Sequence, residues 1–582
     1  MSNSETHIQE TQHAFLVAWG WFAEHIGLIQ QLQALSFKQK HYHHRPQTKV
    51  LEFLVAILAG LQHLQDISLA AHPLDKDQAV AHAWEQPAWA DYSGVSRTLS
   101  GLSWDEVKQI VQALEQVSQP YLTTELTVLC SQGKRVRLDG DLTGIPVSNT
   151  SQTYPNAAFG HMDDEIRLGY QAGVVSLESP TYGRLWLSVA HHPGDTVSCT
   201  QAEALVLAAE ARLQRRPRRR TELLRQRIHA CEQQVAQTGE RLEMQKQAVK
   251  RAKERTASAE QQVQERQQQV DDLEKEYQTR KLQERPTSRL AQAHKRLQAV
   301  LKRLSSRKSA CTQAQRRLDK TTAQRSHQQT ELAHLYQRLL RFEQENAANA
   351  EPIEAEFRLD AGFGTYENVA LLIEMGYEVY TKPHSHKIVT YLKGQVDDTT
   401  VWTPVGANAE LVAWPTLQLK NCSYPLDVAL ERFYTGKTLK QSALFHFGTH
   451  PVTENLPGWF EEYNGRQTIE AGIKESKQVF YLHHLKVRSE PAISLQEAFV
   501  LFAANFIRWA SHWLQAQGQP VENALNVQKL GVKRQVHVAA HVSAQVIQDS
   551  GGKWLKFSEQ SAFAGQVLRV VGDQPSPQKA NF

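Results

Sequence analysis

The sequence of 582 residues predicts an α/β protein whose mixed core is interrupted by a long helical insertion. Three observations lead to this prediction. Apolar residues recur at helical spacing over 10–118, polar and apolar residues alternate in three runs that start at 134, and apolar residues repeat in heptads over 224–342. The chain is long enough for several domains with large buried cores.

The front of the chain is predicted to be helical. The stretches HAFLVAWGWFAEHIGLIQQL and TKVLEFLVAILAGLQHLQDI carry apolar residues at the spacing of one helical face. A later stretch, SGVSRTLSGLSWDEVKQIVQAL, predicts a short helix pair with Ser and Thr caps. This pair fits either a DNA-reading helix-turn-helix or an ordinary helix pair, and the sequence leaves both open. We assign 1–130 to a helical N-terminal DNA-binding domain.

The core is predicted in three pieces. KRVRLDGDLTGIPVS, LGYQAGVVSLES and GRLWLSVAHH alternate with period two, and a helical stretch follows them, so 131–214 forms the first piece. AEFRLDAGF, TYENVALLIEMG and YEVYTKP predict strand, helix and strand, which make 349–384 the second piece. Strand-like runs, among them IVTYLKG, fill a β-rich insertion at 385–455. Helices return in the third piece, 456–520, and 521–582 forms a C-terminal region.

The segment 215–348 is predicted to be an antiparallel coiled-coil hairpin. Two heptad series of matching length, 224–277 and 290–342, are separated by a break at Pro286. Residues 212–345 hold 32 Lys/Arg against 16 Asp/Glu, whereas the whole chain has a net charge of only +4. This concentration of positive charge predicts a polyanionic partner for the hairpin.

Other features of the sequence exclude several classes of protein. The five cysteines are far apart, so neither a zinc site nor a disulfide framework is predicted. The N-terminus is polar and lacks the pattern of a signal peptide. The longest mostly apolar run, VLEFLVAILAGL, is too short to span a bilayer. We therefore expect a cytoplasmic protein without a membrane partner.

The stretch EYNGRQTIEAGIKESK places four polar side chains on one face of a predicted helix. Tyr463, Arg466, Glu470 and Lys477 fall within about 60° of one another at 100° per residue. Such a face is either solvated and laced with salt bridges or part of a site. Two glycines make this a weak surface helix by propensity, so we expect another interaction to hold it in place.

Acidic residues are predicted on three separate elements. Asp139 and Asp141 lie on the same side of the first core strand, Asp360 ends the fourth strand, and Glu470 lies on the late helix. Carboxylate oxygens are the ligands that Mg²⁺ prefers, and two such ions about 4 Å apart support phosphodiester displacement. The three elements together therefore predict a site for divalent cations.

These residues resemble a known pattern. The signature Y-x2-R-x3-E-x6-K is complete and is similar to that of a branch of the bacterial insertion-sequence DDE transposases with a ribonuclease H-like core. LDGDLT resembles the first-acid strand of that family, in which the acid precedes a Thr by two positions, and RLDAGFGTYENVALLIEMGYEVY resembles its second-acid block. The resemblance implies a ribonuclease H-like mixed sheet, a helical N-terminal domain and a β-rich insertion. The coiled-coil hairpin departs from the common pattern of the family.

The resemblance also implies which residues bind metal. Asp141, Asp360 and Glu470 would be the catalytic residues and the ligands of two Mg²⁺ ions, for which Mn²⁺ can substitute. The spacing to the Thr favours Asp141 as the first acid, and Asp139 remains the alternative.

DNA contacts are implied by the same resemblance. Tyr463, Arg466 and Lys477 would contact phosphates near the scissile bond, because Arg offers paired hydrogen bonds and Lys a point charge. Lys474 on the same helix is a further candidate. His384, which follows a strand near the second acid, is either a DNA contact or a solvated loop histidine.

The implied function is cut-and-paste DNA transposition. Metal-dependent hydrolysis would cut one strand at each element end. The released 3′-OH would then attack either the other strand, which forms a hairpinned end, or the target DNA. The implied partners are double-stranded DNA, as terminal inverted repeats and target, and a second copy of the chain in a paired-end complex. The implied location is the nucleoid of a bacterial cytoplasm. The alternative is a non-catalytic DNA-bridging protein that uses the basic hairpin, which the intact acids argue against.

Overall fold

The protein is described by a computed structural model. It covers residues 7–39, 43–162, 165–517, 521–549 and 552–571. The chain divides into two compact units, one made of Met1–Arg218 with Asn349–Phe582 and the other of Arg219–Ala348. Each is described by itself below.

Five strands form the centre of the first unit's main sheet: β2 (Val136–Pro146), β4 (Glu165–Ser179), β5 (Gly183–Pro193), β6 (Ala355–Arg358) and β7 (Glu378–Thr381). Their spatial order is β5-β4-β2-β6-β7. The first three are antiparallel, whereas β2, β6 and β7 are parallel. This is the order of a ribonuclease H-like sheet, so the predicted fold class is confirmed. A short strand, β3 (Ala158–Met162), pairs with the first part of β4.

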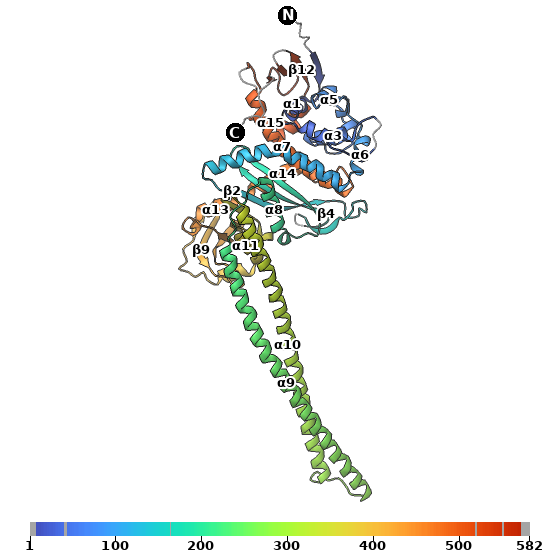
Figure 1. Ribbon diagram of the computed structural model, residues 1–582, viewed down its shortest axis with the longest axis vertical. Helices are drawn as coiled ribbons and strands as arrows, with labels where there is room; N and C mark the ends of the chain where they lie inside the picture. Colours follow the sequence, from blue (N-terminus) through green and yellow to red (C-terminus); the bar gives the residue numbers. More distant parts are fainter. Residues whose placement is uncertain (1–6, 40–42, 163–164, 518–520, 550–551, 572–582) are drawn as a thin grey trace. The chain divides into compact units, whose positions relative to one another are not determined.

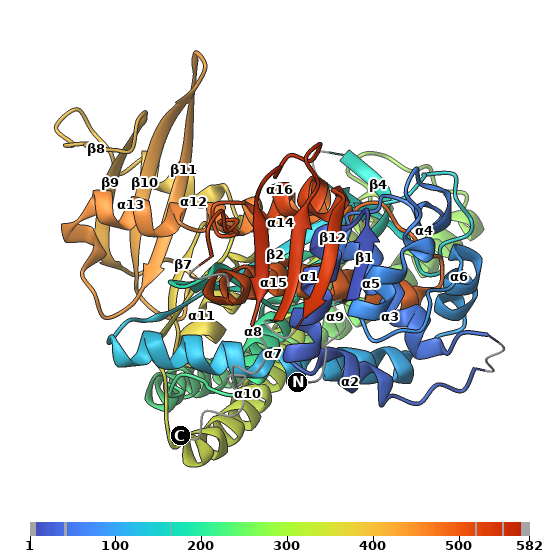
Figure 2. The ribbon, with the colours of Figure 1, turned by 90° about the horizontal axis from the view of Figure 1, so that it is seen from above.

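The predicted β-rich insertion extends this sheet. It contributes β8 (Thr403–Val405), β9 (Ala409–Leu417), β10 (Leu426–Thr435) and β11 (Thr438–Phe447). β11 pairs antiparallel with β7, and the other three follow in the order β10, β9, β8. Figure 2 shows these strands side by side with the helix α13 against them. The insertion therefore has no separate sheet of its own.

One predicted strand in this region is wrong. The stretch IVTYLKG lies largely in a helix, α12 (Lys387–Lys393). Its β-branched residues favour a strand locally. The helix packs against β10 and β11, and Leu392 is fully buried there while its neighbours remain exposed or half-buried. Tertiary packing has therefore overridden local propensity.

Helices cover the sheet. They are α8 (Ala202–Leu213), α11 (Tyr366–Glu374), α13 (Leu456–Asn464), α14 (Gln467–Val479) and α15 (Glu490–Gln517). α8 packs on β4 and β5, α11 on β7, α14 on β2 and α15 on β5. α15 is buried on most sides, as its apolar sequence predicts, because it also contacts the N-terminal helices α1, α3 and α7.

The N-terminal segment is helical beyond its first strand. Its helices are α1 (Ala14–His25), α2 (Leu28–Gln33), α3 (Pro46–Leu58), α4 (Asp66–Leu69), α5 (Gln78–Ala83), α6 (Tyr92–Ser100) and α7 (Trp104–Ser131). The predicted helix pair corresponds to α6 and the start of α7. A capping box between Ser103 and Glu106 starts α7. α7 then continues for 28 residues and packs on α15, so it is much longer than a short recognition helix.

A second, small sheet joins the two ends of the chain. β1 (His7–Thr11) pairs antiparallel with β12 (Ala544–Asp549), which is followed by β13 (Gly552–Phe557) and β14 (Val567–Val570). Figure 2 shows β1, in blue, beside β12, in red. A short helix, α16 (Val532–His537), precedes this sheet. Across the described residues, none of the helices combines the length and apolar character needed to cross a membrane.

The second unit is a helical hairpin. α9 (Thr221–Thr279) and α10 (Arg289–Ala348) run antiparallel, side by side in Figure 1, with the turn at the predicted break. Their buried residues all occupy predicted heptad positions: Leu224, Ile228, Cys231, Thr238, Leu242, Val249, Ala259 and Val270 on α9, and Leu290, Leu297, Thr321, Leu335 and Phe342 on α10. The predicted hairpin is therefore confirmed.

Candidate active site

β2 and β6 carry charged side chains in register. Arg137 lies opposite Glu356, and Asp139 lies opposite Arg358. Both pairs form ion pairs, with N–O distances of 2.8 Å and 2.7 Å. Alternation along each strand keeps these side chains on one side of the sheet.

The next step of this series is a pair of acids. Asp141 follows Asp139 by two positions, and Asp360 follows Arg358 by two, so both point to the same side as the ion pairs. Burial raises the pKa of Asp141 to about 6, and the Asp360 carboxylate beside it acts in the same direction. At the positions of Asp141 and Asp360, neither β2 nor β6 carries a basic side chain. A positive charge that compensates the two acids has to come from another element.

Arg466 supplies that positive charge in this structure. Its Nη1 lies 3.3 Å from Oδ2 of Asp141, and its Nη2 lies 2.8 Å from Oε1 of Glu470. Arg466 also lies close enough to Tyr463 to lower the pKa of its hydroxyl, against the larger effect of burial. Although burial lowers the pKa of Arg466, its anionic neighbours outweigh burial and raise it overall. Arg466 therefore joins Glu470 to the first acid.

The donors present fit a hard divalent cation. Oδ1 of Asp360 is buried and has no hydrogen-bond partner among the described residues, so one acceptor atom beside Asp141 is unsatisfied. Glu470 is more exposed and contacts Arg466 instead of the two aspartates. Within the described parts of the chain, no group of three or more His, Cys, Asp or Glu residues is close enough to hold an ion. The structure thus brings Asp141 and Asp360 together directly and Glu470 through Arg466.

The signature stretch is two helices rather than the single predicted one. α13 ends at Asn464 and α14 begins at Gln467. Between them the backbone tightens, because the amide of Arg466 bonds to the carbonyl of Tyr463 and the amide of Ile469 bonds to that of Arg466. Single-sequence periodicity could not detect this break, since both linking residues keep right-handed helical backbone angles.

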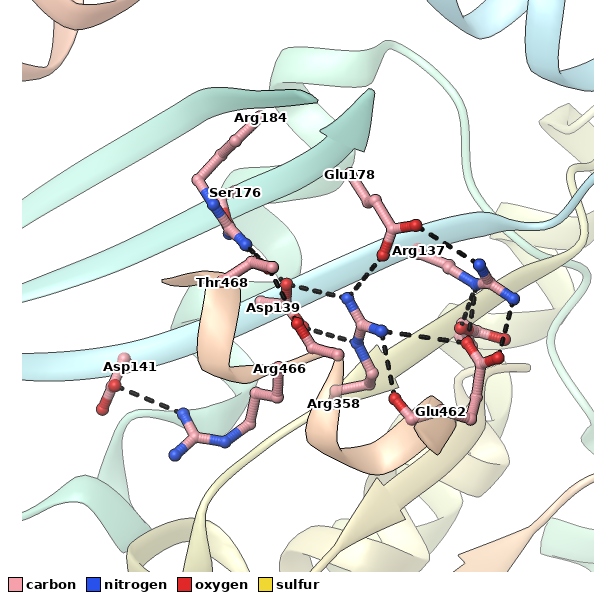
Figure 3. Close-up of polar contacts among 12 residues, drawn as sticks. Arg137, Asp139, Asp141, Ser176, Glu178, Arg184, Arg358, Glu462, Arg466 and Thr468 are labelled. Carbon is pink, nitrogen blue, oxygen red and sulfur yellow. Dashed lines mark hydrogen bonds and ion pairs between the residues drawn. The ribbon is translucent and has the colours of Figure 1, made fainter. Parts of the chain in front are cut away.

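Asp139 belongs to a buried ion network, drawn in Figure 3. Its two oxygens lie 2.7 Å and 3.0 Å from nitrogens of Arg358, and Arg184 approaches at 3.4 Å. The Asp139 side chain is fully buried. Because both oxygens accept from guanidinium groups, this geometry favours Asp141 over the alternative Asp139 as a metal ligand.

The two guanidinium groups bound to Asp139 also hold the signature helices. Arg358 donates to the backbone carbonyl of Glu462, near the end of α13, at 3.1 Å. Arg184 donates to the hydroxyl of Thr468 in the first turn of α14. Figure 3 shows both arginines reaching from the sheet towards this helical segment. The network therefore fixes the helices that carry Arg466 and Glu470 relative to β2.

The two glycines of the signature stretch permit this close approach. A Cβ on Gly465 would lie 2.6 Å from Nη1 of Arg358, and a Cβ on Gly472 would lie 2.9 Å from the ring of Trp186. Any larger side chain at either position would push the helices away from the sheet. Packing against buried arginine and tryptophan side chains is what holds these weak helix formers in place.

A Gly465→Ala substitution should lower the free energy of unfolding of the first unit by roughly 1–3 kcal/mol, because the added methyl group displaces Arg358. The control is Gly239→Ala in α9, where the Cβ meets only Arg325 at 3.6 Å and should stabilise the helix by up to about 1 kcal/mol. All 12 tryptophans lie outside the hairpin, so tryptophan fluorescence in urea reports the first unit and circular dichroism also reports the hairpin. Equal effects of both substitutions would contradict the packing argument.

Glu356 should make stability depend on pH. Burial raises the pKa of Glu356 to about 8, with Glu462 adding repulsion and Arg137 opposing both. Between about pH 4.5 and 8 the folded state holds a proton that the unfolded state has released, so stability should fall as pH rises, by about 1.4 kcal/mol per pH unit at most. Glu356→Gln should remove this part of the slope, as urea unfolding at several pH values would show. An unchanged slope would contradict the assignment.

The remaining predicted DNA contacts differ in exposure. Tyr463 is only 7 % exposed and packs beside Trp459, so the structure does not bring it to the surface. Lys474 is exposed, and Lys477 is half-buried. His384 is an exposed loop residue whose backbone amide bonds to the carbonyl of Gly364, in the turn that follows the second acid. Of these four residues, Lys474 and His384 are therefore the ones whose side chains are exposed.

The sequence analysis missed the residues behind the acids. Arg358, Arg184 and Glu462 all lie in the network, and none was a candidate. One observation could have found the first of them. In EFRLD the charged residues occupy every second position of an otherwise apolar strand, which marks a polar side facing the first acid strand.

Comparisons with known proteins find a likeness in structure but none in sequence. No protein-family model matches the chain, and no curated protein matches its sequence. A cryo-EM structure of a piggyBac transposase synaptic complex with hairpin DNA is similar with a TM-score of 0.35 and 9 % sequence identity. The match covers 91 % of this chain and 80 % of that one. At this level of similarity, any functional assignment has to rest on the residues of the present chain.

Proposed function

We propose that the chain is a DDE-type DNA transposase that cuts and rejoins the ends of an insertion sequence. The observation that carries this proposal is the pair of acids formed by Asp141 on β2 and Asp360 just beyond the end of the parallel strand β6, joined to Glu470 through Arg466. A ribonuclease H-like sheet supports it, because these two acids lie at its central parallel strands and Glu470 lies on a helix packed against β2.

Each residue has a role in this proposal. Asp141, Asp360 and Glu470 would hold two divalent cations, Mg²⁺ or Mn²⁺. When bound, such cations would activate the attacking hydroxyl and stabilise the leaving oxygen of a phosphodiester. Arg466 stands beside all three acids and suits a phosphate oxygen, because its guanidinium group donates in a fixed fork. Lys474, on the exposed side of α14, would hold the DNA backbone without reading its sequence.

Partners follow from the same chemistry. Terminal inverted repeats and target DNA would be the substrates, and two ends cut together require two active sites. We therefore propose a homodimer in a paired-end complex, with strand transfer passing through a hairpinned end as in the family that the sequence resembles. Cut-and-paste movement is the expected overall outcome.

The test is metal-dependent cleavage of a supercoiled plasmid that carries the inverted repeats flanking the coding region. The wild-type chain should nick and linearise this plasmid in Mg²⁺ and leave it intact in EDTA. Glu470→Gln should not cut it. Glu475→Gln is the matched control on the same helix, since Glu475 pairs with Arg508 at 2.8 Å, away from the acids. Equal cutting by the Glu470→Gln variant would overturn the proposal.

A second candidate function is suggested by the charge of the hairpin. A protein that only bridges or organises DNA would need the basic hairpin but no metal site. It would bind the plasmid with the same affinity in Mg²⁺ and EDTA and never cleave it. A transposase would bind the plasmid and also cleave it in Mg²⁺.

A further inference from the structure

The positive charge of the hairpin is concentrated in its middle. Residues 241–260 and 302–329 lie next to each other, since Thr256 bonds to the carbonyl of Arg307 and Glu260 pairs with Lys308. Together they hold 14 Lys/Arg against 4 Asp/Glu. The rest of the hairpin unit holds 14 against 12. Nearly all of the net charge therefore lies in one zone.

Heptad geometry divides this zone into two sides. In each heptad abcdefg, positions a and d form the seam between the two helices. In an antiparallel pair, the g positions next to a face one side of the hairpin, and the e positions next to d face the other side. The lysine side consists of Lys246, Lys250, Lys253 and Lys308 with Glu243, Glu260 and Asp319. The arginine side consists of Arg241, Arg251, Arg255, Arg303, Arg317 and Lys320.

The two sides differ in how their charges are compensated. On the lysine side, Lys246 pairs with Glu243 at 2.7 Å and Lys308 with Glu260 at 2.8 Å. The corresponding heptad positions on the arginine side carry no acid in this zone. All six of its basic residues are exposed, and none forms an ion pair within the hairpin, every residue of which the structure describes.

The arginines of this side are regularly spaced. In the antiparallel register the residues next to the seam alternate between the helices in the order Arg241, Arg317, Arg255, Arg303. At 1.5 Å per residue the series is about 30 Å long, so neighbouring guanidinium groups lie within about a Debye length and repel each other. About 30 Å corresponds to roughly nine base pairs of a DNA duplex, whose phosphates suit the guanidinium fork.

We propose that the arginine side of the hairpin binds the phosphate backbone of double-stranded DNA without reading its sequence. The charge pattern calls for an extended polyanion, and the choice of DNA among polyanions rests on the proposed function. Contact with one duplex would neutralise the uncompensated arginines and leave the lysine side, with its own ion pairs, facing away. The hairpin would then hold flanking or target DNA outside the active site.

The experiment compares two full-length variants with the same change in net charge. One carries Arg241→Gln, Arg255→Gln, Arg303→Gln and Arg317→Gln. The other carries Lys246→Gln, Lys250→Gln, Lys253→Gln and Lys308→Gln on the lysine side. Circular dichroism checks that both retain their helix content. Affinity for a 30-base-pair duplex without element ends is measured from low to high salt, with EDTA present.

The arginine variant should lose two to four phosphate contacts. Its slope of log affinity against log salt should fall by about 2 to 4, with roughly 50-fold weaker binding or more at 0.1 M salt. The lysine variant should keep most of the wild-type slope. Equal slopes for the two variants, or tighter binding of the wild type to a single-stranded RNA of equal length, would overturn the inference.

This outcome can be separated from that of the proposed function. Glu470→Gln in the wild-type background should bind the same duplex with an unchanged slope, because Glu470 belongs to the first unit and the substitution changes no residue of the hairpin. If the wild type cleaves its plasmid but the arginine variant keeps its slope, only the hairpin inference fails. If nothing cleaves but the arginine variant alone loses slope, the DNA-binding side stands and the catalytic proposal fails.

Discussion

The Asp141→Asn variant should fold like the wild type and lose metal-dependent DNA cleavage by about a thousandfold or more. Asn keeps the shape of the side chain and removes the charge that a divalent cation requires. Loss of several kcal/mol of transition-state stabilisation corresponds to such a factor. The fold should tolerate the change, because the charge of Asp141 is already disfavoured by burial and by Asp360.

Asp139→Asn is the matched comparison, two residues earlier on the same strand. It removes the charge that Arg358 and Arg184 share in the interior. Breaking such a buried pair costs about 3–5 kcal/mol, so this variant should lose stability first and activity only as a consequence. Urea unfolding followed by tryptophan fluorescence and plasmid cleavage separate the two effects. A stable, inactive Asp139→Asn beside an active Asp141→Asn would reverse the roles of the two acids.

Arg358→Met should lower stability as strongly as Asp139→Asn does. Arg358 is 1 % exposed and binds Asp139, Glu178 and the carbonyl of Glu462, so its loss removes the two closest ion-pair contacts of the fully buried Asp139. The expected loss is about 3–5 kcal/mol in the free energy of unfolding. Arg167→Met on β4 is the control, because its pair with Glu165 is exposed and contributes at most about 1 kcal/mol.

The same network predicts strong coupling between its members. A double variant, Arg358→Met with Asp139→Leu, should lose less stability than the sum of the single variants, because neither charge is then left alone. The double-mutant cycle in urea measures this difference directly. Additive losses would mean that Arg358 and Asp139 act independently, in conflict with their bidentate contact.

Sequence reasoning reached the features that depend on local order. The heptads of the hairpin are regular, so every buried residue of α9 and α10 falls on a predicted position. The core strands likewise follow from period-two alternation. Asp141, Asp360 and Glu470 were selected as candidate ligands from the spacing of residues within motifs, which can be recognised without knowing the fold. Their metal-binding role remains a prediction.

The sequence could not predict which side chains pair across the fold, because those pairs depend on strand register and tertiary packing. Asp139 remained an alternative to Asp141 because both point to one side of a strand. Only the register with β6 shows that Arg358 occupies its oxygens. The fold of IVTYLKG as a helix likewise depends on the surface of β10 and β11, which no local propensity encodes. The break before α14 has the same origin, since the sheet sets the path of the backbone there.

The pairing of β1 with β12 has a consequence for synthesis on the ribosome. His7 and Gln548 are register partners, so β1 cannot pair until β12, which lies more than 500 positions later, has been made. The hairpin needs only its own two arms and can form while the C-terminal region is still in the exit tunnel. Until β12 is made, β1 lacks its partner in the small sheet. An unpaired strand exposes the nascent chain to misassociation. Deleting the first eleven residues would remove the same partner permanently.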